Sequence, residues 1–380
     1  MASTATAAAP TTAAQETISF TRGVPAVEAL PDRQLAECFA AVVQRDPVGV
    51  LQYGNPAGYP PLRALLAEQY GVTEGQVFAT NGSLQLMDLL AALLVKPGDT
   101  VLVEQPSYDR AILTFRRRGA KVIGIPLEGD GLDVDRLAAQ VEKQTPAFLY
   151  TIPDFQNPSG STLSEGKRRR VLELAERHGF WVLEDVPYRS LRYRGDAPPM
   201  LREVNPARVL TMSSYSKLVA PALRVGHLLG PAEIIAKLAR LGEDTYLTPV
   251  HPAQAMLYEY LRRGWLPENL QRLRAFYTPR WQAMIGAVRT HLPDVPLAEP
   301  DGGFFLSITL PPEAQTEGLL ERAKQAGLLL TDGRAFFADP DEPGVAEAPE
   351  AARFIRLPFC ALTLEQIDEG MRRLARAVQR

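Results

Sequence analysis

Apolar and polar residues alternate along the chain in two different periods, which predict strands and helices in turn from about residue 59 onward. Short apolar runs of the length of buried strands are separated by stretches with helical spacing. The predicted strands are 76–80, 100–104, 121–125, 147–152, 180–184 and 208–212. The predicted helices are 60–70, 83–95, 108–118, 133–143 and 165–178. This order favours an α/β fold, a doubly wound and mainly parallel sheet with helices on both faces.

The pattern changes after residue 230. The stretch from about 252 to 291 is rich in leucine, arginine and aromatic residues, and it predicts one long helix that bridges two domains. Strand patterns at 304–310 and 353–357, with helical patterns near 317–325 and 363–380, predict a second, smaller α+β domain. The expected organisation is a disordered tail (1–15), an N-terminal segment of the small domain (16–48), a large domain (49–285) and a C-terminal small domain (286–380).

Composition narrows the classes of partner. The chain has 380 residues with 46% hydrophobic residues and a net charge of −3, so it lacks a basic field for nucleic acid or an anionic membrane. No apolar run approaches the roughly 20 residues of a membrane span. Two distant cysteines, Cys38 and Cys360, form no metal spacing and favour a reducing compartment. We therefore expect a cytoplasmic protein with no metal, nucleic acid or membrane partner.

The most informative motif follows the predicted strand 208–212. Ser214, Ser216 and Lys217 come directly after it, and Arg224 follows seven residues later. A desolvated lysine loses its proton more easily and captures carbonyl groups, while hydroxyls and a guanidinium suit a phosphate. An amine beside a phosphate cradle indicates a pyridoxal phosphate site. Taken alone, the lysine favours an ordinary exposed loop, so the pyridoxal phosphate interpretation depends on the rest of the chain.

Other predicted strands also end in polar residues, and the carboxyl ends of parallel strands bind ligands. Gly82 and Ser83 begin a helix whose amide groups favour an anion, although Ser83 alone fits a helix cap. Tyr108 is placed to stack on a ring or to pack in the core. Asn157 lies in a turn. Asp185, followed by Tyr188, is a cap or a buried counter-ion. Five such strand ends favour one shared site.

Five motifs together carry a resemblance to a known family. They are Tyr53-Gly54-Asn55-Pro56-Ala57-Gly58, Asn157-Pro158-Ser159-Gly160, Asp185-Val186-Pro187-Tyr188, Ser214-Tyr215-Ser216-Lys217 with Arg224, and Phe354-Ile355-Arg356. From about Ile18 to its end, the chain resembles the fold-type I pyridoxal phosphate enzymes of the class I/II aminotransferase family. It is most similar to the branch with 2-aminoadipate and kynurenine aminotransferases and to the catalytic domain of MocR-type regulators.

The resemblance implies a role for each matching residue. Lys217 forms the internal aldimine and moves the substrate proton, Asp185 pairs with the ring nitrogen, and Tyr188 with Asn157 binds the phenolic oxygen. Tyr108 stacks on the ring. The phosphate is held by Gly82, Ser83, Ser214, Ser216 and Arg224, with Leu84, where relatives often have glutamine, offering only its amide. Tyr53 reaches the phosphate of a second subunit, which implies a homodimer.

The resemblance implies that Arg356 binds the substrate α-carboxylate beside Asn157. Arg22 and Gly23 stand where relatives often read Gly-Gly, and they are further candidates for substrate binding. Three roles are open for Arg22: binding a side-chain carboxylate of the substrate, pairing with a protein carboxylate at the entrance, or lying in solvent. We expect an enzyme that moves an amino group between an α-amino acid and a 2-oxo acid, with glutamate and 2-oxoglutarate as one pair. Another pyridoxal phosphate enzyme of the fold, such as a lyase, decarboxylase or racemase, stays open. A MocR-like regulator without its DNA-binding domain is less expected, because only some 15 residues precede the similar region.

Overall fold

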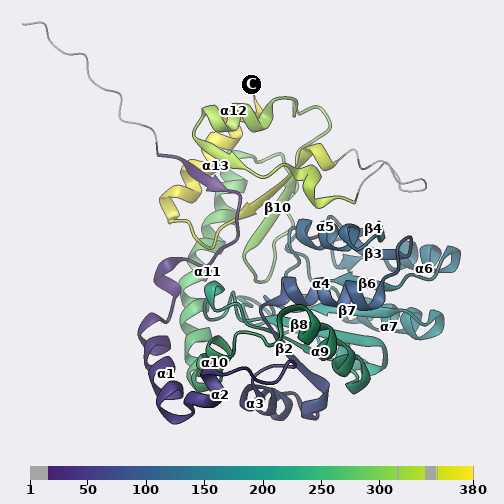
Figure 1. Ribbon diagram of the computed structural model, residues 1–380. Coiled ribbons are helices and arrows are strands. Elements are labelled where there is room, and N and C mark those ends of the chain that lie inside the picture. Colours follow the sequence, from purple (N-terminus) through teal and green to yellow (C-terminus); the bar gives the residue numbers. More distant parts are fainter. Residues whose placement is uncertain (1–15, 315, 339–347, 349, 380) are drawn as a thin grey trace, which may run out of the picture.

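A central sheet with helices on both faces dominates the computed structural model, which describes residues 16–314, 316–338, 348 and 350–379 (Figure 1). In these residues the sheet has eight strands in the order β2-β9-β8-β7-β6-β3-β4-β5. They are β2 (Val77–Thr80), β3 (Thr100–Gln105), β4 (Lys121–Glu128), β5 (Gly131–Leu132), β6 (Phe148–Thr151), β7 (Trp181–Asp185), β8 (Val209–Ser214) and β9 (Gly226–Leu229). Neighbouring strands run parallel with two exceptions. Strand β9 is antiparallel to both β2 and β8, and the short β5 is antiparallel to β4. The predicted doubly wound, mainly parallel sheet is confirmed.

Successive residues of the central strands are buried on opposite faces of the sheet. In β3, Val101 and Val103 join the core that contains Phe115, whereas Leu102 joins the core on the other face. The first core is completed by α3 (Pro60–Tyr70), α4 (Ser83–Leu94), α5 (Asp109–Arg117) and α9 (Ala232–Tyr246), and the second by α6 (Val134–Lys143), α7 (Glu165–His178) and α8 (Leu201–Val204). Burial on both faces explains why these strands read as continuous apolar runs.

The smaller part of the chain contains two short sheets. Strand β1 (Ile18–Phe20) pairs in parallel with β11 (Leu328–Leu330), and β10 (Phe305–Thr309) pairs antiparallel with β12 (Phe354–Pro358). Helices α12 (Leu319–Gln325) and α13 (Leu364–Val378) pack with them. The described residues also contain short 3-10 helices, namely η1 (Val27–Ala29), η2 (Glu74–Gln76), η3 (Pro206–Arg208), η4 (Pro221–Leu223), η5 (Gly333–Phe336) and η6 (Ala351–Arg353). Among the residues described, no helix is long and apolar enough to cross a membrane.

The predicted single helix over 252–291 is wrong, because the structure has two helices there. They are α10 (His251–Arg262) and α11 (Trp265–His291). Gly264 lies between them with φ 71°, a left-handed conformation that ends the first helix. Helices α1 (Asp32–Arg45) and α2 (Pro47–Leu51) and the short α8 were not predicted. Figure 1 shows α11 running between the two parts of the molecule.

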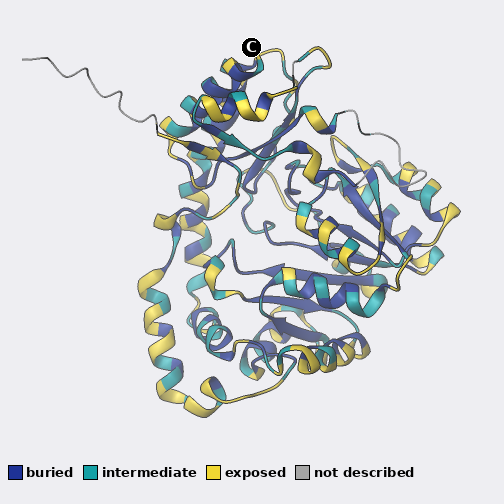
Figure 2. Ribbon diagram, turned by 45° about the horizontal axis from the view of Figure 1, so that its top comes forward, coloured by how far each residue is buried: buried dark blue, intermediate teal, exposed yellow. Residues whose placement is uncertain are grey.

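The buried cores suggest a division of the chain that differs from the predicted one. Helix α1 packs against α10, and its Cys38 and Val42 belong to the core of the large sheet. Only β1 from the predicted 16–48 segment contributes, with Ile18 and Phe20, to the smaller core. Figure 2 shows the strands of the central sheet mainly in dark blue, while α1 at the left is mostly yellow and teal. We propose that β1 and the end of α11 belong to the small domain and that α1 belongs to the large one. The predicted tail 1–15 lies outside the described residues.

Candidate active site

A cavity of about 560 Å³ opens where the carboxyl ends of the central strands meet β10, β12 and the segment after β1. This is the edge at which open parallel sheets bind ligands. Most of the predicted site residues line it, namely Arg22, Gly23, Ser83, Leu84, Tyr108, Asn157, Asp185, Tyr188, Ser214, Ser216, Lys217, Arg224 and Arg356. The strand ends therefore do converge on one site.

Two predicted residues lie outside the lining of the cavity. Gly82 is directly adjacent to it, between β2 and Ser83. Tyr53 lies after α2 with 75% of its surface exposed, so the single chain does not bury it. Its predicted contact with a second subunit stays a prediction.

Lys217 follows β8 and reaches across the cavity to the segment after β1. Its Nζ donates a hydrogen bond to the carbonyl oxygen of Gly23 at 2.7 Å and lies 5.8 Å from the centre of the Phe304 ring. Burial lowers the pKa of Lys217, and the positive charges of Arg356 and Arg224 lower it further. The amine therefore loses its proton more readily than an exposed lysine.

Asp185 ends β7 and is a buried carboxylate with one unused oxygen. Its Oδ2 accepts a hydrogen bond from the Tyr150 hydroxyl at 2.9 Å. Its Oδ1 has no hydrogen-bond partner among the described residues, although it is buried. Burial raises the pKa of Asp185 to about 7, and the bond from Tyr150 opposes that rise. A positively charged donor in the cavity would supply the missing partner.

Two tyrosines and an asparagine line the cavity beside Asp185. Tyr188 is buried and packs edge-on against Phe305, with ring centres 5.8 Å apart. Burial raises the pKa of Tyr108 to about 12, with further contributions from Asp109 and Asp185, so its hydroxyl stays protonated. The Oδ1 of Asn157 accepts a hydrogen bond from Arg356 at 3.0 Å. Because the oxygen is used in this way, the amide nitrogen of Asn157 is left to donate elsewhere.

Hydroxyl and guanidinium groups gather at the start of α4. The Ser214 hydroxyl lies 3.0 Å from the Ser216 hydroxyl, which accepts from Arg224 Nη1 at 3.2 Å. Gly82 has φ +90°, and a Cβ there would lie 2.3 Å from Arg224 Nη2, so the backbone at this point needs glycine. The helix amide groups after Gly82 add positive polarity. These donors together form a cradle for an anion such as phosphate.

Arg356 is held in one orientation by groups from four parts of the chain. Its Nη1 donates to Asn157, and its Nη2 donates to the carbonyl oxygen of Thr21 at 2.6 Å. The guanidinium lies 4.9 Å from the centre of the Phe305 ring and 4.7 Å from that of Phe336. Only 7% of Arg356 is exposed, and its Nε has no partner among the described residues. The side chain is therefore oriented before any carboxylate arrives.

Several neighbouring groups were not found from the sequence. The carbonyl oxygens of Thr21 and Gly23 carry no sequence signal, because every residue has one. Phe305 and the pair Asp109 and Arg110 also line the cavity. Arg110 lies two positions after Tyr108 in the same predicted helix. Its closeness to a predicted site residue was the one sequence feature that could have indicated its place in the cavity.

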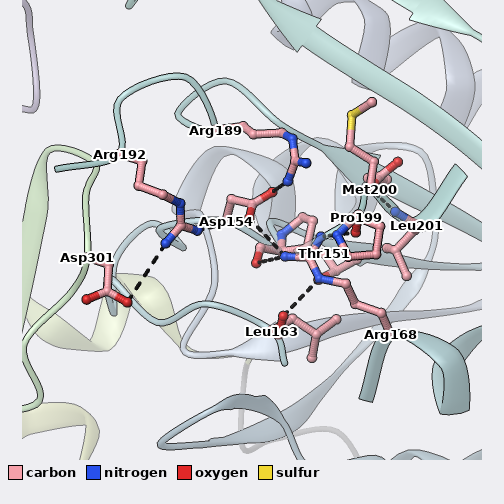
Figure 3. A network of polar contacts seen from close by, with 12 residues as sticks. Thr151, Asp154, Leu163, Arg168, Arg189, Arg192, Pro199, Met200, Leu201 and Asp301 are labelled. Carbon is pink, nitrogen blue, oxygen red and sulfur yellow. Dashed lines mark hydrogen bonds and ion pairs between the residues drawn. The ribbon is translucent and has the colours of Figure 1, made fainter. Parts of the chain in front are cut away.

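A buried ionic network anchors the turn that carries Asn157 (Figure 3). Asp154 is fully buried and contacts Arg168 at 2.9 Å and Arg189 at 3.1 Å. Arg192 lies 3.7 Å from Asp154 and 3.8 Å from Asp301, in the segment that leads into β10. The network therefore connects the turn to the part of the chain that enters the smaller domain.

Comparison with known proteins gives a consistent picture. The family model described as aminotransferase class I and II matches residues 17–374. The chain is 35% identical to the 2-aminoadipate transaminase of Thermus thermophilus over 95% of this chain and 90% of that protein. It is 33% identical to aromatic-amino-acid aminotransferase 1 of Thermococcus litoralis over 96% of this chain and 88% of that protein. A solved structure that matches is the α-aminoadipate aminotransferase of Thermus thermophilus in complex with N-(5'-phosphopyridoxyl)-L-leucine. The match has a TM-score of 0.88 and 34% sequence identity, and it covers 96% of this chain and 92% of that chain.

Proposed function

The chain belongs to the class I and II aminotransferases and uses pyridoxal phosphate, and from this premise we propose that it moves an amino group between an α-amino acid and a 2-oxo acid, with glutamate and 2-oxoglutarate as one pair. The observation that carries this proposal is the buried Oδ1 of Asp185, which has no hydrogen-bond partner in the part of the chain that the structure describes and lies in the cavity that Lys217 also lines. A buried carboxylate oxygen without a partner is costly, and a protonated ring nitrogen would satisfy it.

The residues present fit the cofactor at both of its ends. The cradle of Ser214, Ser216 and Arg224 at the start of α4 suits the phosphate. Asp185 suits the ring nitrogen, and Tyr108 offers a ring for stacking. When bound, pyridoxal phosphate supplies an aldehyde that condenses with amines and a ring that withdraws electrons from the substrate Cα.

We assign the chemical roles among this chain's residues as follows. Lys217 supplies an amine that takes the proton from the substrate Cα, which its lowered pKa favours. Asn157 donates its amide N–H and Tyr188 its hydroxyl to the phenolic oxygen of the cofactor. Arg356 binds the α-carboxylate of the substrate, because its orientation is already set and a guanidinium fits a carboxylate with two parallel hydrogen bonds.

The charge of the cavity favours substrates with a second carboxylate. Besides Arg356 and Arg224, its lining includes Arg22 and Arg110, while Asp109 and Asp185 are its acidic members. Arg22 is exposed at the segment after β1. We assign Arg22 to the side-chain carboxylate of glutamate or 2-aminoadipate, with Gly23 beside it.

A homodimer is part of this proposal. Exposed apolar side chains lie around α2, where Val48 is 72%, Leu51 61% and Tyr53 75% exposed. Leu247 and Val250 are more than half exposed on the neighbouring segment, which His251 ties to Asn55 through a 3.3 Å contact. A second copy of the chain would cover these groups and bring Tyr53 to the phosphate cradle of the other copy.

The test is a screen of amino donors with 2-oxoglutarate, measured as glutamate formed by the purified protein supplied with pyridoxal phosphate. At least one α-amino acid is expected to give glutamate, and Lys217→Ala is expected to bind the cofactor without turnover. Loss of the substrate Cα proton or carboxylate without any glutamate would instead favour a racemase or decarboxylase. A wild-type protein that binds no pyridoxal phosphate would refute the assignment of the site.

A further inference from the structure

Glu104 is a buried carboxylate at the end of β3 that has no part in the chemistry assigned above. Only 2% of it is exposed. Its oxygens accept three hydrogen bonds, from Thr151 Oγ1 at 2.6 Å, from the Ile152 amide at 3.1 Å and from Gln156 Nε2 at 3.1 Å. Burial raises the pKa of Glu104 to about 7, and these three donors act in the opposite direction. They therefore stabilise the charged form at this site.

Gln156 connects Glu104 to two turns through hydrogen bonds. Its Nε2 also donates to the carbonyl oxygen of Pro106 at 2.8 Å. Its Oε1 accepts from the amide of Ser159 at 2.8 Å and from the Ser159 hydroxyl at 2.7 Å. A carboxylate only accepts hydrogen bonds, so the Gln156 amide has to turn its NH₂ group toward Glu104 and its oxygen toward Ser159. Glu104, the Pro106 carbonyl and the Ser159 amide thus all favour the same orientation of this amide, the one in which Gln156 bridges the two turns.

The two turns that meet at Gln156 each carry a cavity residue. Pro106 precedes Tyr108 by two positions, and Gln156 directly precedes Asn157. We propose that Glu104 is a positioning residue, which through Gln156 holds Asn157 and Tyr108 at the distance that the cofactor ring requires. This inference rests on the roles proposed above for those two residues.

Glu184 on β7 provides a matched control within the same sheet. It is also fully buried and accepts hydrogen bonds from Thr211 Oγ1 at 2.7 Å and from the Leu201 amide at 2.6 Å. Those donors lie in β8 and α8, and neither of them lines the cavity. Glu184 directly precedes Asp185, but none of its hydrogen bonds leads to the turns that carry Asn157 and Tyr108.

Four variants separate positioning from general stability. Methionine is similar in length to glutamate but accepts only weakly, so Glu104→Met removes the strong acceptors with little change in volume. Glu104→Gln keeps an acceptor for Ile152 and Gln156 while its NH₂ group turns to the Thr151 hydroxyl, which can accept. Gln156→Met cuts only the link to the two turns. Glu184→Met removes the same kind of buried carboxylate, one that does not line the cavity and has no hydrogen bond to the two turns.

Three measurements are made on each variant. They are the Kd for pyridoxal phosphate, the pH midpoint of the visible absorption band of the bound cofactor, and the unfolding temperature of the cofactor-free protein. For Glu104→Met and Gln156→Met we expect Kd to rise by about 10-fold or more and the midpoint to move to higher pH, because the phenolic oxygen loses the Asn157 donor. For Glu104→Gln we expect near-native values. Glu184→Met is expected to lower the unfolding temperature while leaving Kd and the midpoint unchanged.

Native Kd and midpoint in both Glu104→Met and Gln156→Met would overturn the proposal. If Glu104→Met does not fold, Gln156→Met alone decides, since Glu104 keeps two of its donors there. Equal effects in Glu184→Met would also overturn it, because the loss would then reflect general stability. Failure of the wild-type protein to bind pyridoxal phosphate would instead contradict the proposed function.

Discussion

Replacing Asp185 with asparagine is expected to stabilise the cofactor-free protein at neutral and higher pH while weakening its binding of pyridoxal phosphate. Asp185 is buried, and one of its two oxygens has no hydrogen-bond partner among the described residues. The charged form is therefore unfavourable until a cation arrives. Asparagine can still accept the Tyr150 hydrogen bond, but it carries no charge and offers no strong acceptor to a protonated ring nitrogen.

The size of the effect follows from the pKa of Asp185, which burial raises from 3.8 to about 7. Between these values the folded protein binds a proton that the unfolded chain has released, so stability falls as pH rises. Above about pH 7 the full penalty is present, on the order of 4 kcal/mol. Below pH 3.8 the penalty is absent, because both states are protonated. Asp185→Asn should remove this dependence on pH and leave the contribution of Glu104 in place.

The assay is thermal unfolding of the cofactor-free wild type and variant at about pH 5 and about pH 8, with cofactor titrations at the higher pH. The variant should gain most at the higher pH and bind the cofactor more weakly. Asp154→Asn is the control, since Asp154 is equally buried but paired with Arg168, and breaking such a pair destabilises by about 3–5 kcal/mol. An Asp185→Asn protein that is less stable than the wild type at pH 8, or that binds the cofactor as tightly, would refute the reasoning.

Two further predictions concern substrate binding. Arg356→Ala should raise KM for every amino acid, because all substrates present the same α-carboxylate, and the loss of binding free energy should be about 2–5 kcal/mol. An effect confined to dicarboxylic substrates in steady-state kinetics would show that Arg356 binds the side chain instead. Arg22→Gly should lower kcat/KM for glutamate and 2-oxoglutarate and spare leucine, a discrimination on the order of 1–3 kcal/mol. Arg33→Gly, on the exposed start of α1, is its control, and equal losses with acidic and apolar substrates would reject a side-chain role for Arg22.

The sequence predicted the strand ends of the site well, for a physical reason. Asn157, Asp185 and Lys217 follow apolar runs, and parallel strands place such residues at one edge of a sheet whatever the details of packing. The pattern also located most central strands to within a few residues. Their alternation between two buried faces made each run wholly apolar.

The failures of sequence reasoning share a different cause. A helical pattern shows which face of a helix is buried but not which element covers it, so the packing of α1 on α10 was not foreseen. The break at Gly264 depends on one left-handed residue inside an otherwise continuous helical pattern. Glu104 and Gln156 are 52 positions apart, and only the fold makes them neighbours. Such contacts leave no periodic trace in the chain.

The segment after β1 shows how far such unforeseen contacts determine the site. Its carbonyl oxygens accept hydrogen bonds from Arg356 at Thr21, from Lys217 at Gly23 and from Cys360 at Val24. Thr331 Oγ1 adds a second donor to the Thr21 oxygen. The backbone is thus fixed on both sides of residue 22 by groups other than the Arg22 side chain. Removing that side chain should therefore leave the segment in place, so Arg22→Gly tests the guanidinium itself rather than the closure of the cavity.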